Sequence, residues 1–168
     1  RSQDRPADAR VHKADGIMFR PAIPADIYRL IEMGQAFHKE AGVAERHPGL
    51  VFDTESFAYT AALLIDAHLL LVMEHNGLPV AMAAADGAPC WFNRNFMLGK
   101  ELLWYVEPEH RKGKDSRHLL AALEEVAKAR GIHLFDVVAE EGERSEALGR
   151  LYRRADYNPA ERVFRKRL

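Results

Sequence analysis

The chain has 168 residues, which is enough for one domain and short for two. Hydrophobic residues make up 48% and charged residues 29%, and this globular composition excludes a mainly disordered chain. The formal net charge is −1, whereas a protein that holds nucleic acid by neutralising phosphates is usually basic overall. One cysteine, Cys90, leaves no internal disulfide to form and indicates a reducing, cytoplasmic compartment. The apolar runs, such as 69–73, are far shorter than the roughly 20 residues of a membrane span.

The predicted elements begin after a polar segment. Residues 1–17 lack hydrophobic periodicity and precede the first methionine, so we expect a disordered leader or an expression remnant there. A single folded domain is expected over 18–168. Residues 18–21 are predicted to form a short strand, and apolar residues at helical spacing predict an amphipathic helix over 24–39.

The next elements change from helix to strand. Asp53 suits the N-cap of a second helix over 54–66, after a loop rich in glycine and proline. Two short apolar runs, 68–74 and 78–85, then flank an Asn-Gly pair, which is typical of a tight hairpin. The turn residues of 87–95 predict a loop, whose aromatic side chains would either line a substrate pocket or latch over the sheet.

The second half continues the alternation. An apolar strand is predicted at 101–106, and a helix begins at Asp115 and ends at Gly131. A strand over 132–139, a helix over 147–155 and a last strand at 163–164 follow. This order of elements predicts a mixed α/β domain.

The segment between the apolar strand and the helix at Asp115 is the most informative. A strand that leads directly into a helix leaves the N–H groups of the first turn pointing outward, where they bind anions. Basic residues add positive charge at the same place: Arg111, Lys112, Lys114 and Arg117. The segment suits a pyrophosphate, and a solvated basic connector is the alternative interpretation.

This segment resembles a known loop. The GNAT superfamily of N-acetyltransferases carries Arg/Gln-x-x-Gly-x-Gly/Ala between a strand and the following helix. Here Arg111 and Ser116 occupy the first and last positions, Lys114 replaces the first glycine, and Gly113 lies one place earlier. The resemblance implies that the loop cradles the pyrophosphate of acetyl-CoA.

A second motif of the family is matched further along the chain. Its pattern, Asn-x-x-Ala-x-x-Leu-Tyr-x-x-x-Gly-Phe, is met here by Leu151 and Tyr152, with Ser145, Asp156 and Tyr157 at the substituted positions. The opening at 20–26 also looks like the first strand and helix of the family. The resemblance covers 18–168 and implies a mixed, mostly antiparallel central sheet with flanking helices.

The resemblance also implies a reaction and its residues. The acetyl group would move from acetyl-CoA directly to a primary amine. Tyr152 would protonate the leaving thiolate, because a phenol is protonated at neutral pH; alternatively it packs its helix. Glu101 would act as the base; alternatively it is a strand-end charge facing solvent. The glutamate of the family sits about one residue earlier, at Lys100, so a bulge is needed to correct the face of Glu101.

The cofactor-binding residues implied by the resemblance fall into two groups. Backbone groups at the end of the apolar strand would pair with the pantetheine arm, and the loop with the later serine would hold the rest of acetyl-CoA. These residues are Tyr105, Val106, Glu107, Arg111, Lys112, Gly113, Lys114, Asp115, Ser116 and Ser145.

Other functions and partners follow from weaker features. The acceptor is expected to be an amine of a small molecule or a protein, and the chain is expected to form a homodimer, with no membrane partner and no metal. The substituted glycine positions favour, as a rival, a GNAT-fold binding protein without transferase activity. Segment 150–168 carries seven basic and two acidic residues, which favours a third reading, acylation of a modified nucleic acid; nucleic acid is otherwise an unexpected partner.

Overall fold

The computed structural model describes residues 13–14, 16–111, 114–139 and 145–166. These residues fall into two compact units that divide between Asp136 and Val137. The strands of the first unit are β1 (Lys13–Ala14), β2 (Ile17–Pro21), β3 (Leu70–His75), β4 (Leu78–Cys90), β5 (Asn93–Val106) and β6 (Leu134–Asp136). Its helices are η1 (Pro24–Asp26), α1 (Ile27–Glu40), α2 (Val43–Arg46), α3 (Thr54–Asp66), η2 (Pro108–His110) and α4 (Asp115–Ala129), whereas α5 (Ser145–Arg154) belongs to the second unit.

The sheet of the first unit is mixed and mostly antiparallel. Its six described strands lie in the order β1-β2-β3-β4-β5-β6, and each pair from β1 to β5 is antiparallel. β6 pairs with β5 in parallel, over Leu98 to Lys100 of β5. The mixed, mostly antiparallel sheet with flanking helices that the resemblance implies is therefore confirmed.

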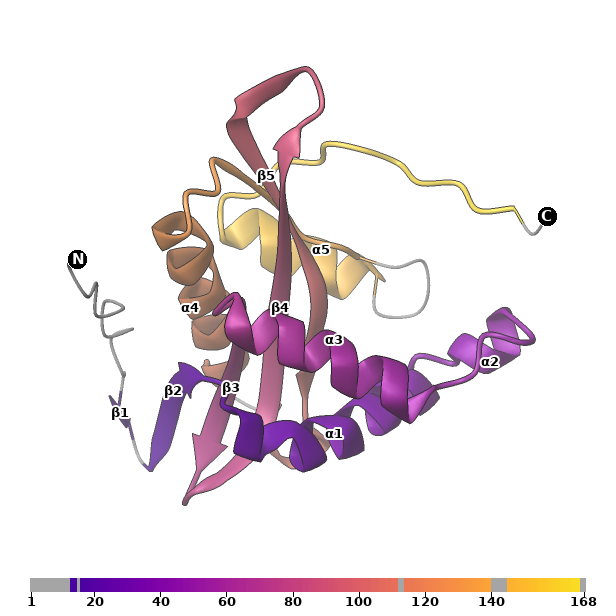
Figure 1. Cartoon of the computed structure of the whole chain (residues 1–168), viewed down its shortest axis with the longest axis vertical. Helices are drawn as coiled ribbons and strands as arrows, with labels where there is room; N and C mark the ends of the chain where they lie inside the picture. Colours follow the sequence, from indigo (N-terminus) through magenta and orange to yellow (C-terminus); the bar gives the residue numbers. More distant parts are fainter. Residues whose placement is uncertain (1–12, 15, 112–113, 140–144, 167–168) are drawn as a thin grey trace. The chain divides into compact units, whose positions relative to one another are not determined.

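Helices α1 and α3 lie on one face of this sheet and α4 on the other (Figure 1), and an apolar cluster of buried side chains lies on each face. Because side chains alternate along a strand, Leu71 and Met73 of β3 face α4, whereas Leu70 and Val72 face α1 and α3. β4 contributes small side chains, which are buried from Val80 to Ala85 and let the helices approach closely on both faces. The core therefore lies on both sides of β3 and β4.

The starts of the helices follow local sequence signals. Asp53 caps α3 as expected, because its carboxylate accepts a hydrogen bond from the Ser56 N–H at 2.7 Å. α1 follows the 3₁₀ turn at Pro24, and α4 spans the residues predicted from Asp115 onward. Gly131, just after α4, has a φ of 78°, the left-handed conformation typical of a glycine that terminates a helix, as expected.

Three regions differ from the sequence predictions. The prediction of a loop over 87–95 is wrong, because β4 continues to Cys90 and β5 starts at Asn93. Trp91 and Phe92 form the tip of this hairpin and are 89% and 74% exposed, so they do not latch over the sheet. The short helix α2 was not predicted. β1 and the first residue of β2 lie ahead of Met18, within the segment expected to be a disordered leader.

The second unit contains one helix and an extended end. Within α5, the side chain of Tyr152 is buried and its ring packs edge-on against Tyr157. The strand expected at Val163-Phe164 is wrong: both residues are outside regular structure, and the Phe164 side chain is 91% exposed. Among the described residues, no helix is long and apolar enough to cross a membrane.

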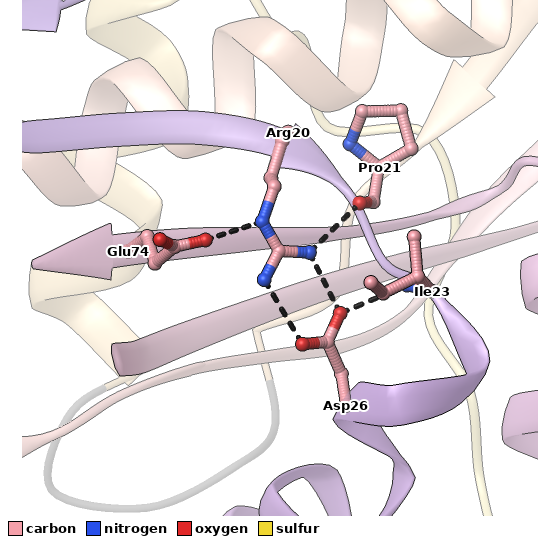
Figure 2. A network of polar contacts seen from close by, with 5 residues as sticks. All are labelled: Arg20, Pro21, Ile23, Asp26 and Glu74. Atoms are coloured by element: carbon pink, nitrogen blue, oxygen red, sulfur yellow. Dashed lines mark hydrogen bonds and ion pairs between the residues drawn. The ribbon is translucent and has the colours of Figure 1, made fainter. Parts of the chain in front are cut away.

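A buried ion network fixes the start of α1 to the sheet (Figure 2). The Arg20 guanidinium donates to both carboxylate oxygens of Asp26, at 2.7 and 2.9 Å, and its Nε donates to Glu74 on β3. The Ile23 N–H also donates to Asp26, at 2.8 Å. Asp26 and Glu74 are buried, and their charges are matched by one arginine and by backbone donors.

Candidate functional site

The end of β5 has one open backbone edge. β4 pairs with β5 as far as Val106, but on the opposite edge β6 pairs only with Leu98 to Lys100. β6 therefore ends before it reaches Tyr105 and Val106, and within the described part of the first unit no strand pairs with these two residues on that edge. A strand end that extends beyond its neighbour is a place where an extended ligand can pair with the backbone. It lies where the pantetheine arm was expected to pair.

A bulge in β5 decides where Glu101 lies. Leu103 pairs with Ala84 and Glu101 pairs with Ala85, so Leu102 is the extra residue on β5. Ala85 belongs to the apolar cluster that includes α4. Since paired residues share a face, Glu101 lies on the α4 side of the sheet and Lys100 on the other side. The carboxylate of Glu101 is half-buried there.

The predicted pantetheine residues are held firmly by their neighbours. Tyr105 and Val106 are buried, and burial raises the pKa of the Tyr105 hydroxyl. The Glu107 N–H donates to the Val80 carbonyl at 3.0 Å, which continues the pairing with β4 for one residue. The Glu107 carboxylate accepts from the guanidinium of Arg29 on α1, whose Nε donates to the Pro79 carbonyl at 2.9 Å. The backbone at the end of β5 is therefore preorganised.

The first turn of α4 presents N–H groups without a side-chain cap. Lys114 is the N-cap residue, and its side chain makes no capping hydrogen bond. Its φ of −100° is in the ordinary range, so the lysine that replaces the glycine of the motif is not strained there. Asp115 and Ser116 follow as the first helical residues and are half-buried. Lys112 and Gly113, the two remaining residues of the predicted cradle, lie outside the described residues.

Arg111 does not extend alone into solvent. Its Nη atoms donate to both carboxylate oxygens of Glu40, at 2.8 and 2.6 Å, and its Nε donates to the Val106 carbonyl at 2.7 Å. The guanidinium also lies 5.5 Å from the centre of the Tyr105 ring. The hydrogen bonds to Glu40 raise the pKa of Arg111. This predicted pyrophosphate residue therefore links the last residue of α1 to the end of β5.

The second unit holds the other two predicted site residues, and their positions relative to the first unit are not fixed. The hydroxyl of Tyr152 donates to the Val138 carbonyl at 3.0 Å. Ser145 begins α5. Asp156, at the position of the motif glycine, has a φ of 64°. Aspartate tolerates this left-handed conformation better than most residues, so the substitution keeps the turn that glycine provides in the motif.

Two residues that hold the site were not among the predicted cofactor-binding residues: Arg29 was not singled out, and the segment that contains Glu40 was expected near the acceptor side. Glu40 is 71 positions from Arg111, and Arg29 is 78 positions from Glu107. Both lie on α1, where single charged residues are typical of the solvent face of an amphipathic helix. No local signal distinguishes them from their neighbours. Among the described residues, no group of three or more histidine, cysteine, aspartate or glutamate residues could hold a metal ion.

Comparisons with known proteins identify the fold. No family model and no curated protein matches the chain. Solved structures do match. An acetyltransferase of Clostridium acetobutylicum, solved with acetyl-CoA, is 22% identical, with a TM-score of 0.67 over 90% of this chain and 96% of that one. An aminoglycoside acetyltransferase from an uncultured soil sample is 16% identical, with a TM-score of 0.69 over 90% and 98%.

One of the matching structures is described as a transcriptional regulator and not as an acetyltransferase. A transcriptional regulator of Bacillus halodurans is 16% identical to this chain, with a TM-score of 0.70 over 90% of this chain and 99% of that one. At these identities the likeness shows a shared fold, and the activity of this chain has to be argued from its own site.

Proposed function

Since the chain has the fold of the GNAT acetyltransferases, we propose that it is an acetyltransferase that moves an acetyl group from acetyl-CoA to a primary amine. The observation that carries this proposal is the end of β5 at Tyr105 and Val106, which β6 does not reach and which is followed by η2 and then by the uncapped first turn of α4. The edge offers backbone hydrogen bonds to an extended arm, and the helix start offers N–H groups to an anion at its end.

The residues present fit acetyl-CoA, which supplies an activated acetyl thioester. Of the predicted pantetheine residues Tyr105, Val106 and Glu107, the Glu107 N–H donates to Val80 and the Val106 carbonyl accepts from Arg111, so the arm would pair with the other backbone groups of this segment. The N–H groups from Lys114 to Ser116 would receive the pyrophosphate, since the negative φ of Lys114 keeps its N–H in the helical path. Lys112, Gly113 and Ser145 complete the set proposed from the motif, and Arg111 begins the loop that carries it.

Two side chains are proposed to move protons. The amine nitrogen attacks the thioester carbonyl, a tetrahedral intermediate forms, and the carbon–sulfur bond then breaks. Glu101 would accept the proton that the amine loses, and Tyr152 would donate its hydroxyl proton to the departing thiolate. The hydroxyl of Tyr152 already acts as a donor, toward the Val138 carbonyl, which is the protonation state that this role requires.

The first test is calorimetric titration with acetyl-CoA in low and moderate salt. We expect a dissociation constant in the micromolar range, worth about 8 kcal/mol at 1 μM. Tyr152→Phe should then lower turnover by roughly 10²-fold, the lower end for a general acid, and leave acetyl-CoA binding within twofold. Tyr28→Phe, which alters an exposed tyrosine of α1, is the matched control. No binding at millimolar acetyl-CoA would reject the proposal.

A binding protein without transferase activity is the second candidate. The three substituted motif positions, Lys114, Ser116 and Asp156, favour it, and a transcriptional regulator shares the fold. Such a protein would bind acetyl-CoA or another ligand, and Tyr152→Phe would change nothing that is measured. Affinity for nucleic acid that falls steeply with salt would instead support the reading based on the basic end of the chain.

The remaining expectations stay proposals. The acceptor is proposed to be an amine of a small molecule or a protein, and a screen of amines with detection of released CoA would identify it. A homodimer is proposed without a defined interface, and light scattering tests it. A cytoplasmic location is proposed because the chain has a single cysteine.

A further inference from the structure

We propose that Glu40 is a positioning residue for the cofactor loop and acts through Arg111. This inference rests on the proposed function, since it concerns how the start of α4 is held ready for a pyrophosphate. Arg111 occupies the position that the motif associates with this ligand, yet its guanidinium is already committed to two protein partners, Glu40 and Val106.

The geometry of this contact is that of a strong ion pair. Two parallel N–H···O bonds, at 2.8 and 2.6 Å, join the guanidinium to the carboxylate of Glu40, an arrangement that fixes orientation as well as distance. The side chains are 28% and 30% exposed, so the pair is partly accessible to water and its value lies in fixing geometry. The ring of Tyr105 lies beneath the guanidinium and closes one face of it.

The contact joins three elements that are far apart in the sequence. Glu40 is the last residue of α1, Val106 is the last residue of β5, and Arg111 follows η2 on the way to α4. The Nε–H group of Arg111 donates to the Val106 carbonyl at 2.7 Å, and this hydrogen bond joins the residues on the two sides of η2. Glu40 therefore helps to set where Arg111 and the turn lie relative to the end of β5.

Two roles for Arg111 make opposite predictions about Glu40. If Arg111 is a direct ligand of the pyrophosphate, Glu40 competes with the anion, and removing its charge should tighten binding. If Arg111 instead holds the turn, Glu40 supports it, and removing its charge should weaken binding. The fork geometry and the bond to Val106 favour the second role, because both would be lost if the guanidinium turned toward a ligand.

The experiment measures acetyl-CoA affinity by calorimetry for the wild type, Glu40→Gln, Arg111→Lys and the double variant. We expect each single substitution to weaken binding about tenfold. The double variant should bind no more weakly than either single variant, because residues that act as one unit are not additive. Arg111→Lys keeps the positive charge but cannot form the two parallel hydrogen bonds to Glu40. A loss of acetyl-CoA affinity in this variant would therefore come from lost geometry and not from lost charge.

Two controls locate the effect. Glu32→Gln makes the same chemical change on the same helix, at a carboxylate that pairs with Arg29 at 2.8 Å, and should leave affinity within twofold. S-acetylpantetheine lacks the pyrophosphate, and its affinity should be unchanged in Glu40→Gln. Urea unfolding of each variant confirms that the protein titrated is folded.

The outcomes separate this inference from the proposed function. Wild-type protein that fails to bind acetyl-CoA overturns both. Wild-type binding in the micromolar range together with tighter or unchanged binding by Glu40→Gln overturns the positioning role alone. Effects that add in the double variant, or an equal loss of affinity for S-acetylpantetheine, also overturn it.

Discussion

Among the described residues, Arg20 and Arg111 each donate two hydrogen bonds to one carboxylate, and the surroundings of the two pairs differ. Arg20 holds Asp26 in the interior, with Glu74 and the Ile23 N–H completing the network. Arg111 holds Glu40 at a half-exposed position, where the rest of its contacts are the Val106 carbonyl and the Tyr105 ring. The first carboxylate is 7% exposed and the second 30%.

The difference teaches what each contact can do. Breaking a buried pair leaves an uncompensated charge away from water, so the interior network contributes substantially to the free energy of unfolding. Water can replace a half-exposed partner at little cost, so the pair at the cofactor loop contributes little to stability and is suited to holding geometry. We expect substitutions to separate these two roles cleanly.

The largest expected effect follows from removing Asp26. Asp26→Ala should lower the free energy of unfolding by about 3 kcal/mol, because Arg20 loses two hydrogen bonds and the Ile23 N–H loses its acceptor. Urea unfolding followed by circular dichroism measures this change. Asp26→Asn is the matched control: it keeps an acceptor for Ile23 and should lose less. Equal stability of Asp26→Ala and wild type would contradict a structural role for the network.

The helices of this fold were largely predictable from sequence, and the long hairpin was not. The cap at Asp53 and the period of the following residues placed α3 correctly. The end of the β4–β5 hairpin contains glycine, proline and asparagine, which are typical of loops. Its glycines serve close packing instead. A Cβ at Gly99 would lie 2.7 Å from a methyl carbon of Ile132, so the strand accepts this neighbour only without a side chain.

The candidate site was predictable only where it is local. The approach from β5 to α4 follows from consecutive residues, and the structure has a strand, a turn and a helix start there. The face of Glu101 depended on a bulge at Leu102, which a strand pattern does not reveal, because the extra residue shifts the alternation without changing composition. Glu40 and Arg29 reach the site only through packing of α1 on the sheet, which a single sequence leaves open.

The second effect is a dependence of stability on pH. Burial acts to raise the pKa of Asp26, but the hydrogen bonds from Arg20 and Ile23 outweigh it, and the folded-state pKa lies below the unfolded value of about 4. Ionised Asp26 therefore stabilises the fold fully above pH 4, and this contribution is lost as the pH falls through the folded-state pKa. Unfolding free energies of wild type and Asp26→Asn should differ by roughly 1–2 kcal/mol at pH 6 and converge once the pH is below the folded-state pKa of Asp26. A constant difference over this range would show that Asp26 does not titrate with folding.

The smallest expected effect is on the stability of the contact at the cofactor loop. Glu40→Gln should lower the free energy of unfolding by about 0.5 kcal/mol, because its ion pair is half-exposed and water takes over the hydrogen bonds of Arg111. Glu32→Gln, which removes an exposed pair from the same helix, should change it by a similar amount. Urea unfolding in parallel compares the two. The contrast with Asp26 then rests on function. Near-equal stabilities of Glu40→Gln and Glu32→Gln, with acetyl-CoA affinity lost only in Glu40→Gln, would show that the Glu40 carboxylate positions a loop. A loss of stability as large as that of Asp26→Ala would instead make Glu40 a second structural anchor.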